Sequence, residues 1–181
     1  MINFRQRSLL MALFENTPSI FFLGLLHWVG DLRLAGWSGA IFAAAVCTAY
    51  ITRTIKPHAI LLGINIYMLL ITPSIEMLVF LDMNAWADML IANAQSFVLV
   101  AIFLTGCVMT AFTKNGFLGA PNKHRKQVIR YSLLLLGVSF LSIVLTFAVN
   151  AGRFSEIGIP LLLLFGIRQF LIARMEDRED K

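Results

Sequence analysis

Two carboxylates lie inside apolar segments of this chain, each beside a copy of the short motif TPSI. Glu15 precedes the first copy and Glu76 follows the second. Proline removes a helix donor and disfavours helical geometry in the residue before it, so Pro18 and Pro73 are predicted helix breaks. A break beside a carboxylate frees backbone carbonyls and creates a polar pocket, as in the ion and substrate sites of transporters. Kinks that serve helix packing have the same sequence pattern.

Glu76 is the main residue of the first candidate site, a polar site inside a predicted membrane span. A carboxylate within a membrane span is costly and usually faces a partner, a cavity or the bundle interior. Asn65, Thr72 and Glu76 are separated by seven and four residues, which places them on one helix face. One interpretation is a polar path or proton site in which Glu76 titrates. The other, which we favour, is a structural contact in which protonated Glu76 bonds to a neighbouring helix.

Glu15 has a simpler interpretation, as a carboxylate near a helix start or at the level of the lipid head groups. It also belongs to the predicted intramembrane polar site, because it lies beside the first TPSI motif. Arg168 is long enough to reach the inner membrane surface or a carboxylate there. Glu15 is therefore its candidate partner by depth.

Small and hydroxyl residues predict helix packing in two other segments, because such residues let membrane helices approach closely. One side of the second apolar segment carries Gly39, Ala40, Ala43, Ala44 and Cys47. The fifth carries a predicted packing seam of Ser132, Ser139, Ser142 and Thr146. A hydrophilic lining is the alternative for the fifth segment.

The composition indicates a lipid-embedded protein. Hydrophobic residues make up 59% of the 181 residues and charged residues 14%, against about 45–50% and about 25% in soluble domains. The two cysteines and three histidines have no metal-ligand spacing, and no catalytic motif is present. We therefore expect no enzyme, no metal and no cofactor.

Charge patterning predicts an all-α fold of six transmembrane helices in three hairpins, with both termini cytoplasmic. Basic residues gather on alternate connections, at the two termini, around 53–56 and in the loop 114–129. The predicted spans, each about the 20 residues that a bilayer requires, are 8–30, 34–52, 58–81, 89–113, 130–150 and 157–175.

The whole chain, 1–181, is predicted to be a single integral membrane domain with three flanking features. Residues 1–16 are either an interfacial helix or the start of the first span, and 176–181 form a charged tail. The basic loop 114–129 is predicted to be cytoplasmic, with Lys123, Arg125 and Lys126 contacting anionic lipid head groups. Topology and lipid attraction account for these charges, so we expect no nucleic-acid partner.

Residues at the two ends resemble a known family. Glu15-x-x-Pro18 followed by two phenylalanines is similar to the opening of the bacterial intracellular septation protein A (YciB) family. Phe165, Gln169 and Arg174 resemble the pattern of that family's last span. The sequences NAWAD and NAGRFSEIG depart from it. The resemblance implies a small inner-membrane protein linked to septation and envelope maintenance, which acts through partners and carries no active site.

Three functions follow as expectations. The leading one is an accessory or scaffold protein of the bacterial inner membrane that binds division or wall-synthesis proteins, or a second copy of itself. The alternative is a small transporter or channel with a polar path around Glu76. A third is a lipid-handling protein that uses the basic loop.

Overall fold

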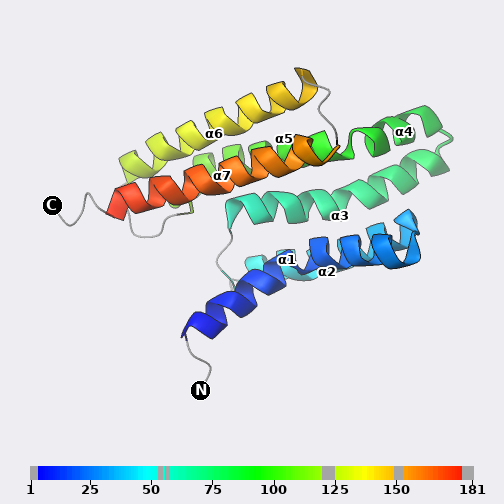
Figure 1. The fold of residues 1–181 in the computed structure, drawn as a ribbon, viewed down its shortest axis with the longest axis horizontal. Helices are drawn as coiled ribbons and strands as arrows, with labels where there is room; N and C mark the ends of the chain where they lie inside the picture. The colour runs from blue at the N-terminus through cyan, green and yellow to red at the C-terminus, as the bar shows by residue number, and fades with distance from the viewer. Residues whose placement is uncertain (1–3, 53–54, 56–57, 120–124, 149–152, 177–181) are drawn as a thin grey trace. The chain divides into compact units, whose positions relative to one another are not determined.

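The computed structural model describes residues 4–52, 55, 58–119, 125–148 and 153–176. These residues form helices joined by turns, and they contain no strand, so the predicted all-α class is confirmed. The helices are α1 (Phe4–Val29), α2 (Leu32–Ile51), α3 (Ala59–Phe80), α4 (Asn84–Ala92), α5 (Ala94–Phe112), α6 (Arg125–Ala148) and α7 (Arg153–Glu176) (Figure 1).

Several of the described helices are long and apolar enough to cross a membrane, which marks this as a membrane-spanning protein. Four pass by length and hydropathy: α2, α3, α6 and α7. The pair α4 and α5 passes together as a fifth, interrupted candidate. The predicted span 89–113 is therefore divided at Asn93. Among the described residues, α1 is not one of these candidates.

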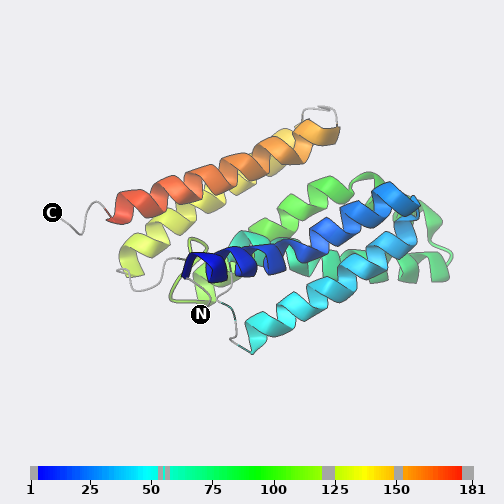
Figure 2. The same ribbon diagram turned by 60° about the horizontal axis from the view of Figure 1, so that its bottom comes forward.

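The chain divides into two compact units, Met1–Ala92 and Asn93–Lys181. In the N-terminal unit, α2 packs against both α1 and α3, and α1 and α2 run side by side in both views (Figures 1 and 2). Gly30, with φ of +73°, makes the turn between them. Asp31 caps α2, because its carboxylate accepts hydrogen bonds from the backbone N–H groups of Arg33 and Leu34.

The two TPSI motifs pack on α2 one helical turn apart. A Cβ atom on Gly36 would lie 2.7 Å from the Thr72 Oγ1 atom of α3. A Cβ atom on Gly39 would lie 2.9 Å from the Met68 terminal methyl carbon of α3 and 3.6 Å from the Pro18 carbonyl oxygen of α1. Glycine at these two positions therefore lets both neighbouring helices approach the α2 backbone.

The helix breaks predicted at Pro18 and Pro73 are absent, since both prolines lie inside continuous helices. Each proline leaves the carbonyl four residues earlier, Leu69 or Phe14, without its helix donor, and in each case the next carbonyl along the helix accepts a side-chain hydrogen bond. Beside Pro73, the Ser74 hydroxyl donates to the Leu70 carbonyl at 2.8 Å. Near Pro18, the Asn65 amide of α3 donates to the Glu15 carbonyl at 3.3 Å. An interfacial helix over 1–16 that ends in a turn at the first motif is likewise not observed, because α1 continues through this motif.

In the C-terminal unit, α5, α6 and α7 contact one another and enclose a packed turn over residues 113–119. Phe117 and Leu118 of this turn are fully buried. Leu118 packs in a cluster with Val128, Leu171 and Met175. The predicted loop 114–129 is thus shorter than expected, because α6 already begins at Arg125. Residues 120–124 lie outside the described part of the chain.

Replacing Gly36 by alanine is expected to lower the free energy of unfolding in detergent by about 1–3 kcal/mol, because the new methyl group overlaps Thr72. Gly39→Ala is expected to cost less, since the flexible end of Met68 can move. Gly137→Ala in α6 is the matched control, with nothing within 4 Å of its new Cβ atom. Equal stability of Gly36→Ala and Gly137→Ala would contradict this packing.

Candidate functional site

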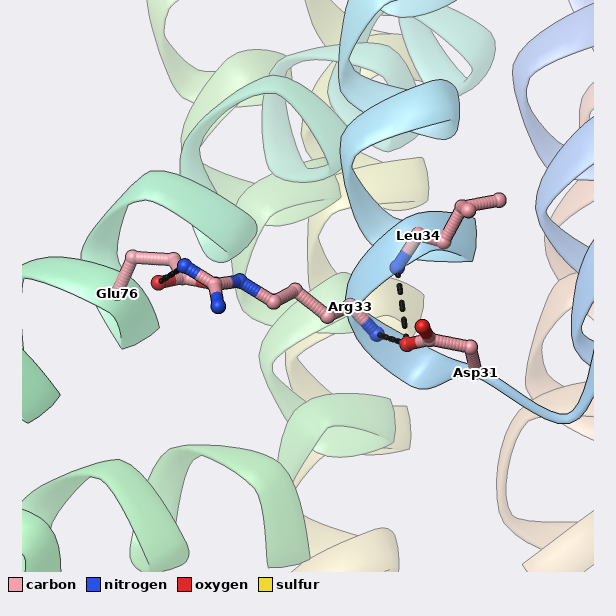
Figure 3. Close-up of polar contacts among 4 residues, drawn as sticks. All are labelled: Asp31, Arg33, Leu34 and Glu76. Atoms are coloured by element: carbon pink, nitrogen blue, oxygen red, sulfur yellow. Dashed lines mark hydrogen bonds and ion pairs between the residues drawn. The ribbon is translucent and has the colours of Figure 1, made fainter.

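Glu76 of α3 forms an ion pair with Arg33 of α2 (Figure 3). The Arg33 Nε atom lies 2.5 Å from Glu76 Oε1, and Nη2 donates to Oε2 at 2.8 Å. Two neighbouring guanidinium nitrogens thus meet both carboxylate oxygens, the strongest geometry of an arginine–carboxylate pair. The pair lies where α2 begins and α3 ends, and the Arg33 side chain is 73% exposed.

This contact assigns Glu76 a partner that was not predicted. The favoured interpretation of Glu76 is a bond to a neighbouring helix in its protonated form, whereas in the structure its carboxylate forms an ion pair with Arg33. Because α2 and α3 pack as antiparallel neighbours, a residue near the start of α2 lies level with one near the end of α3. An antiparallel α2–α3 hairpin was predicted from the sequence, and aligning its two helices would have predicted the pair of Arg33 and Glu76.

Asn65 and Thr72 are buried and contact groups different from those that Glu76 contacts. Thr72 packs on Gly36, and the Asn65 amide reaches the backbone of α1. Between them, Met68 reaches Gly39. The predicted polar face of α3 is therefore divided by an apolar side chain, and its three polar residues serve three separate contacts.

Glu15 belongs to a second polar cluster, formed by Glu15 of α1, Tyr50 of α2 and Asn65 of α3. The three residues are 9%, 8% and 1% exposed. Tyr50 interacts electrostatically with Glu15 and Asn65. The Asn65 Oδ1 atom makes no hydrogen bond within the part of the chain that the structure describes. We call these three residues the Glu15 cluster.

Tyr50 was absent from the predicted site. Its signal in the sequence is weak, since a tyrosine near the end of an apolar segment usually marks the membrane interface. Here it is buried, and only the packing of α1, α2 and α3 brings its hydroxyl towards Glu15.

The C-terminal unit places two predicted residues on the packed turn. Ser132 Oγ accepts a hydrogen bond from the Leu118 N–H at 3.2 Å, and Arg168 Nε donates to the Leu118 carbonyl at 3.0 Å. Gly116, with φ of +57°, brings the turn so close to α6 that a Cβ atom would lie 2.5 Å from Ser132 Oγ. Arg168 therefore holds a buried backbone group.

The other residues of the predicted seam follow α6. Ser139 and Ser142 are buried, and the Thr146 hydroxyl donates to the Ser142 carbonyl of its own helix. Arg125 and Lys126 of the predicted lipid contact are exposed at the start of α6, whereas Lys123 lies outside the described residues. Among the residues described, no group of three or more histidine, cysteine or acidic side chains is placed to hold a metal ion.

No family model, curated protein or solved structure matches this chain. The relationship to the septation family stays a prediction. Of the residues that suggested it, Glu15 and Pro18 are buried in α1 against α2 and α3. Gln169 and Arg174 are exposed on α7, where they are available to lipid or to another protein.

Replacing Ser132 by alanine is expected to leave the buried Leu118 N–H group without its acceptor. The loss is about 1 kcal/mol, or about a five-fold faster hydrogen exchange at that amide. Ser139→Ala is the matched control, because the Ser139 hydroxyl has no hydrogen-bond partner among the described residues. Hydrogen-exchange mass spectrometry in detergent measures both variants, and equal exchange over 113–119 would contradict the anchoring role of Ser132.

Proposed function

We propose that this protein supports septation and envelope maintenance in the bacterial inner membrane by binding other membrane proteins. The observation that carries the proposal is that three of its polar side chains are engaged in contacts within the protein. Glu76 is held by Arg33, the Asn65 amide binds the Glu15 backbone, and Arg168 binds the packed turn. Groups engaged in this way stabilise a fixed arrangement of helices, which a binding scaffold requires.

The proposed topology has six spans in three hairpins, with both termini in the cytoplasm. The spans would be α1, α2, α3, the pair α4 and α5, α6 and α7. The apolar character of α2, α3, α6 and α7, and of the interrupted pair, supports five of them. For α1, which is one helix from Phe4 to Val29, the alternation of basic connections supports a span.

The proposed partners are anionic lipids and membrane proteins of division or wall synthesis, or a second copy of the chain. Exposed Arg125 and Lys126 support the lipid contact, since each basic residue near an anionic surface contributes about 1 kcal/mol. Lys123 is expected to join them. The same lipid attraction is the basis of the third proposal, a lipid-handling role.

A small transporter or channel is the second candidate function, and the Glu15 cluster favours it. Glu76 was its expected centre, but the ion pair with Arg33 compensates the charge of Glu76 near the helix end. The buried carboxylate of Glu15, with polar groups from two other helices, is the better centre for such a path.

Deleting the gene is expected to give filaments or misplaced septa, which microscopy measures. Wild type and Glu76→Gln are both expected to restore division at equal membrane levels, because the ion pair serves packing. Affinity purification of the tagged protein is expected to recover division or wall-synthesis proteins.

Normal division in the deletion strain, together with purification that recovers no such protein, would contradict the scaffold. Rescue by wild type and Glu76→Gln but not by Glu15→Gln, at equal membrane levels, would favour the transporter centred on the Glu15 cluster.

A further inference from the structure

We propose that the start of α2 carries a binding site for one phospholipid with a primary ammonium head group, phosphatidylethanolamine. An acyl chain of this lipid lies in a groove along α2, its phosphate binds Arg33, and its ammonium group binds Asp31. The site lies wholly within the N-terminal unit. It goes beyond the scaffold function and does not depend on it.

The groove has a volume of about 490 Å³ and follows one face of α2. Its lining residues are Asp31, Arg33, Leu34, Trp37, Ser38 and Ile41. The volume falls within the range of roughly 300–1,000 Å³ that is usual for sites of small molecules. The apolar lining residues recur at spacings of three and four, which places them on one side of the helix. The groove therefore has a charged end at the start of α2 and an apolar wall along the helix.

The apolar wall is exposed, and its surroundings identify the kind of molecule that covers it. Leu34, Trp37 and Ile41 are 48%, 42% and 66% exposed. Because α2 is long and apolar enough to cross a membrane, its start lies at a membrane surface. Ile41 follows Arg33 by eight residues, or about 12 Å along the helix, which is the direction of an acyl chain below its head group. Trp37 lies between them, and tryptophan prefers the boundary between head groups and hydrocarbon.

Both charged residues of the groove keep groups that can bind a head group. Two guanidinium nitrogens of Arg33, Nε and Nη2, contact Glu76, whereas Nη1 has no partner within the part of the chain that the structure describes (Figure 3). Asp31 accepts both of its backbone hydrogen bonds through Oδ1, and Oδ2 accepts none from the described residues. A donor for a phosphate and an acceptor for an ammonium group therefore line one end of the same groove.

The charges select among head groups. Asp31, Arg33 and Glu76 together carry one net negative charge, which favours a lipid with a positive group beside its phosphate. A primary ammonium group donates charge-assisted hydrogen bonds to a carboxylate. The quaternary ammonium group of phosphatidylcholine has no N–H and is recognised by cages of aromatic rings. Among the described residues, Trp37 is the one aromatic side chain that lines this groove, so phosphatidylethanolamine fits better.

Native mass spectrometry of the purified full chain in detergent tests the site. The protein is titrated with phosphatidylethanolamine and with phosphatidylcholine of identical acyl chains. Anionic lipids are left out, because they would also bind Arg125 and Lys126. Wild type is expected to bind the first phosphatidylethanolamine about ten-fold more tightly, since a charge-assisted hydrogen bond to Asp31 distinguishes the two lipids.

Asp31→Asn is expected to remove this preference and to leave phosphatidylcholine binding unchanged. Asparagine caps helices as well as aspartate does, so the start of α2 is retained while the charge is lost. Asp88→Asn is the matched control, because it removes an exposed carboxylate of α4 outside the groove, and it is expected to keep the ten-fold preference. Arg33→Gln combined with Glu76→Gln keeps the net charge and is expected to weaken both lipids about ten-fold, through loss of the phosphate contact.

Equal affinity of the wild type for the two lipids, or a preference that Asp31→Asn retains, would overturn the site. A dimer of the chain that forms without lipid and binds neither lipid would also overturn it, because a second copy would then cover the groove.

Discussion

The N-terminal unit depends on the close approach of α1 and α3 to the backbone of α2 at Gly36 and Gly39. Lipid tails are as apolar as leucine, so helices in a membrane associate through tight packing and interhelical hydrogen bonds. Glycine exposes the α2 backbone to Thr72 on one turn and to Pro18 on the next. The repeated TPSI motif therefore has a packing role in both copies. The first copy buries Pro18, and the second buries Thr72.

Polar groups hold the α2–α3 pair near both of its ends. Arg33 and Glu76 meet where α2 begins, and Tyr50 lies near Glu15 and Asn65 where α2 ends. The first pair is exposed enough for water to screen it, whereas the Glu15 cluster is buried. This difference separates an exposed ion pair from a buried group of polar side chains. It also connects the scaffold and transporter proposals, since one rigid hairpin supports both.

The apolar periods and the charge pattern predicted the helical class and the approximate place of each helix. They did not predict the division at Asn93 or the continuity of α1 through Pro18. A proline removes only one N–H donor, and whether a helix continues through it depends on neighbouring groups that the sequence does not place. The spacing of Asn65, Thr72 and Glu76 correctly predicted that they share one face of a helix. It did not predict which group each of them contacts. Those contacts depend on how neighbouring helices are aligned along their lengths. The same alignment brings Tyr50 close to Glu15 and Asn65.

The most direct measurement of this account is disulfide formation between cysteines at positions 36 and 72, with Cys47 and Cys107 first replaced by alanine. A Cβ atom on Gly36 would lie 3.6 Å from the Thr72 Cβ atom, within the range of about 3.5–4.5 Å in disulfides. Mild oxidation in native membranes is expected to join Gly36→Cys to Thr72→Cys within one chain. A full-length double variant that stays reduced, while remaining accessible to the oxidant, would contradict the close approach of α3 to α2.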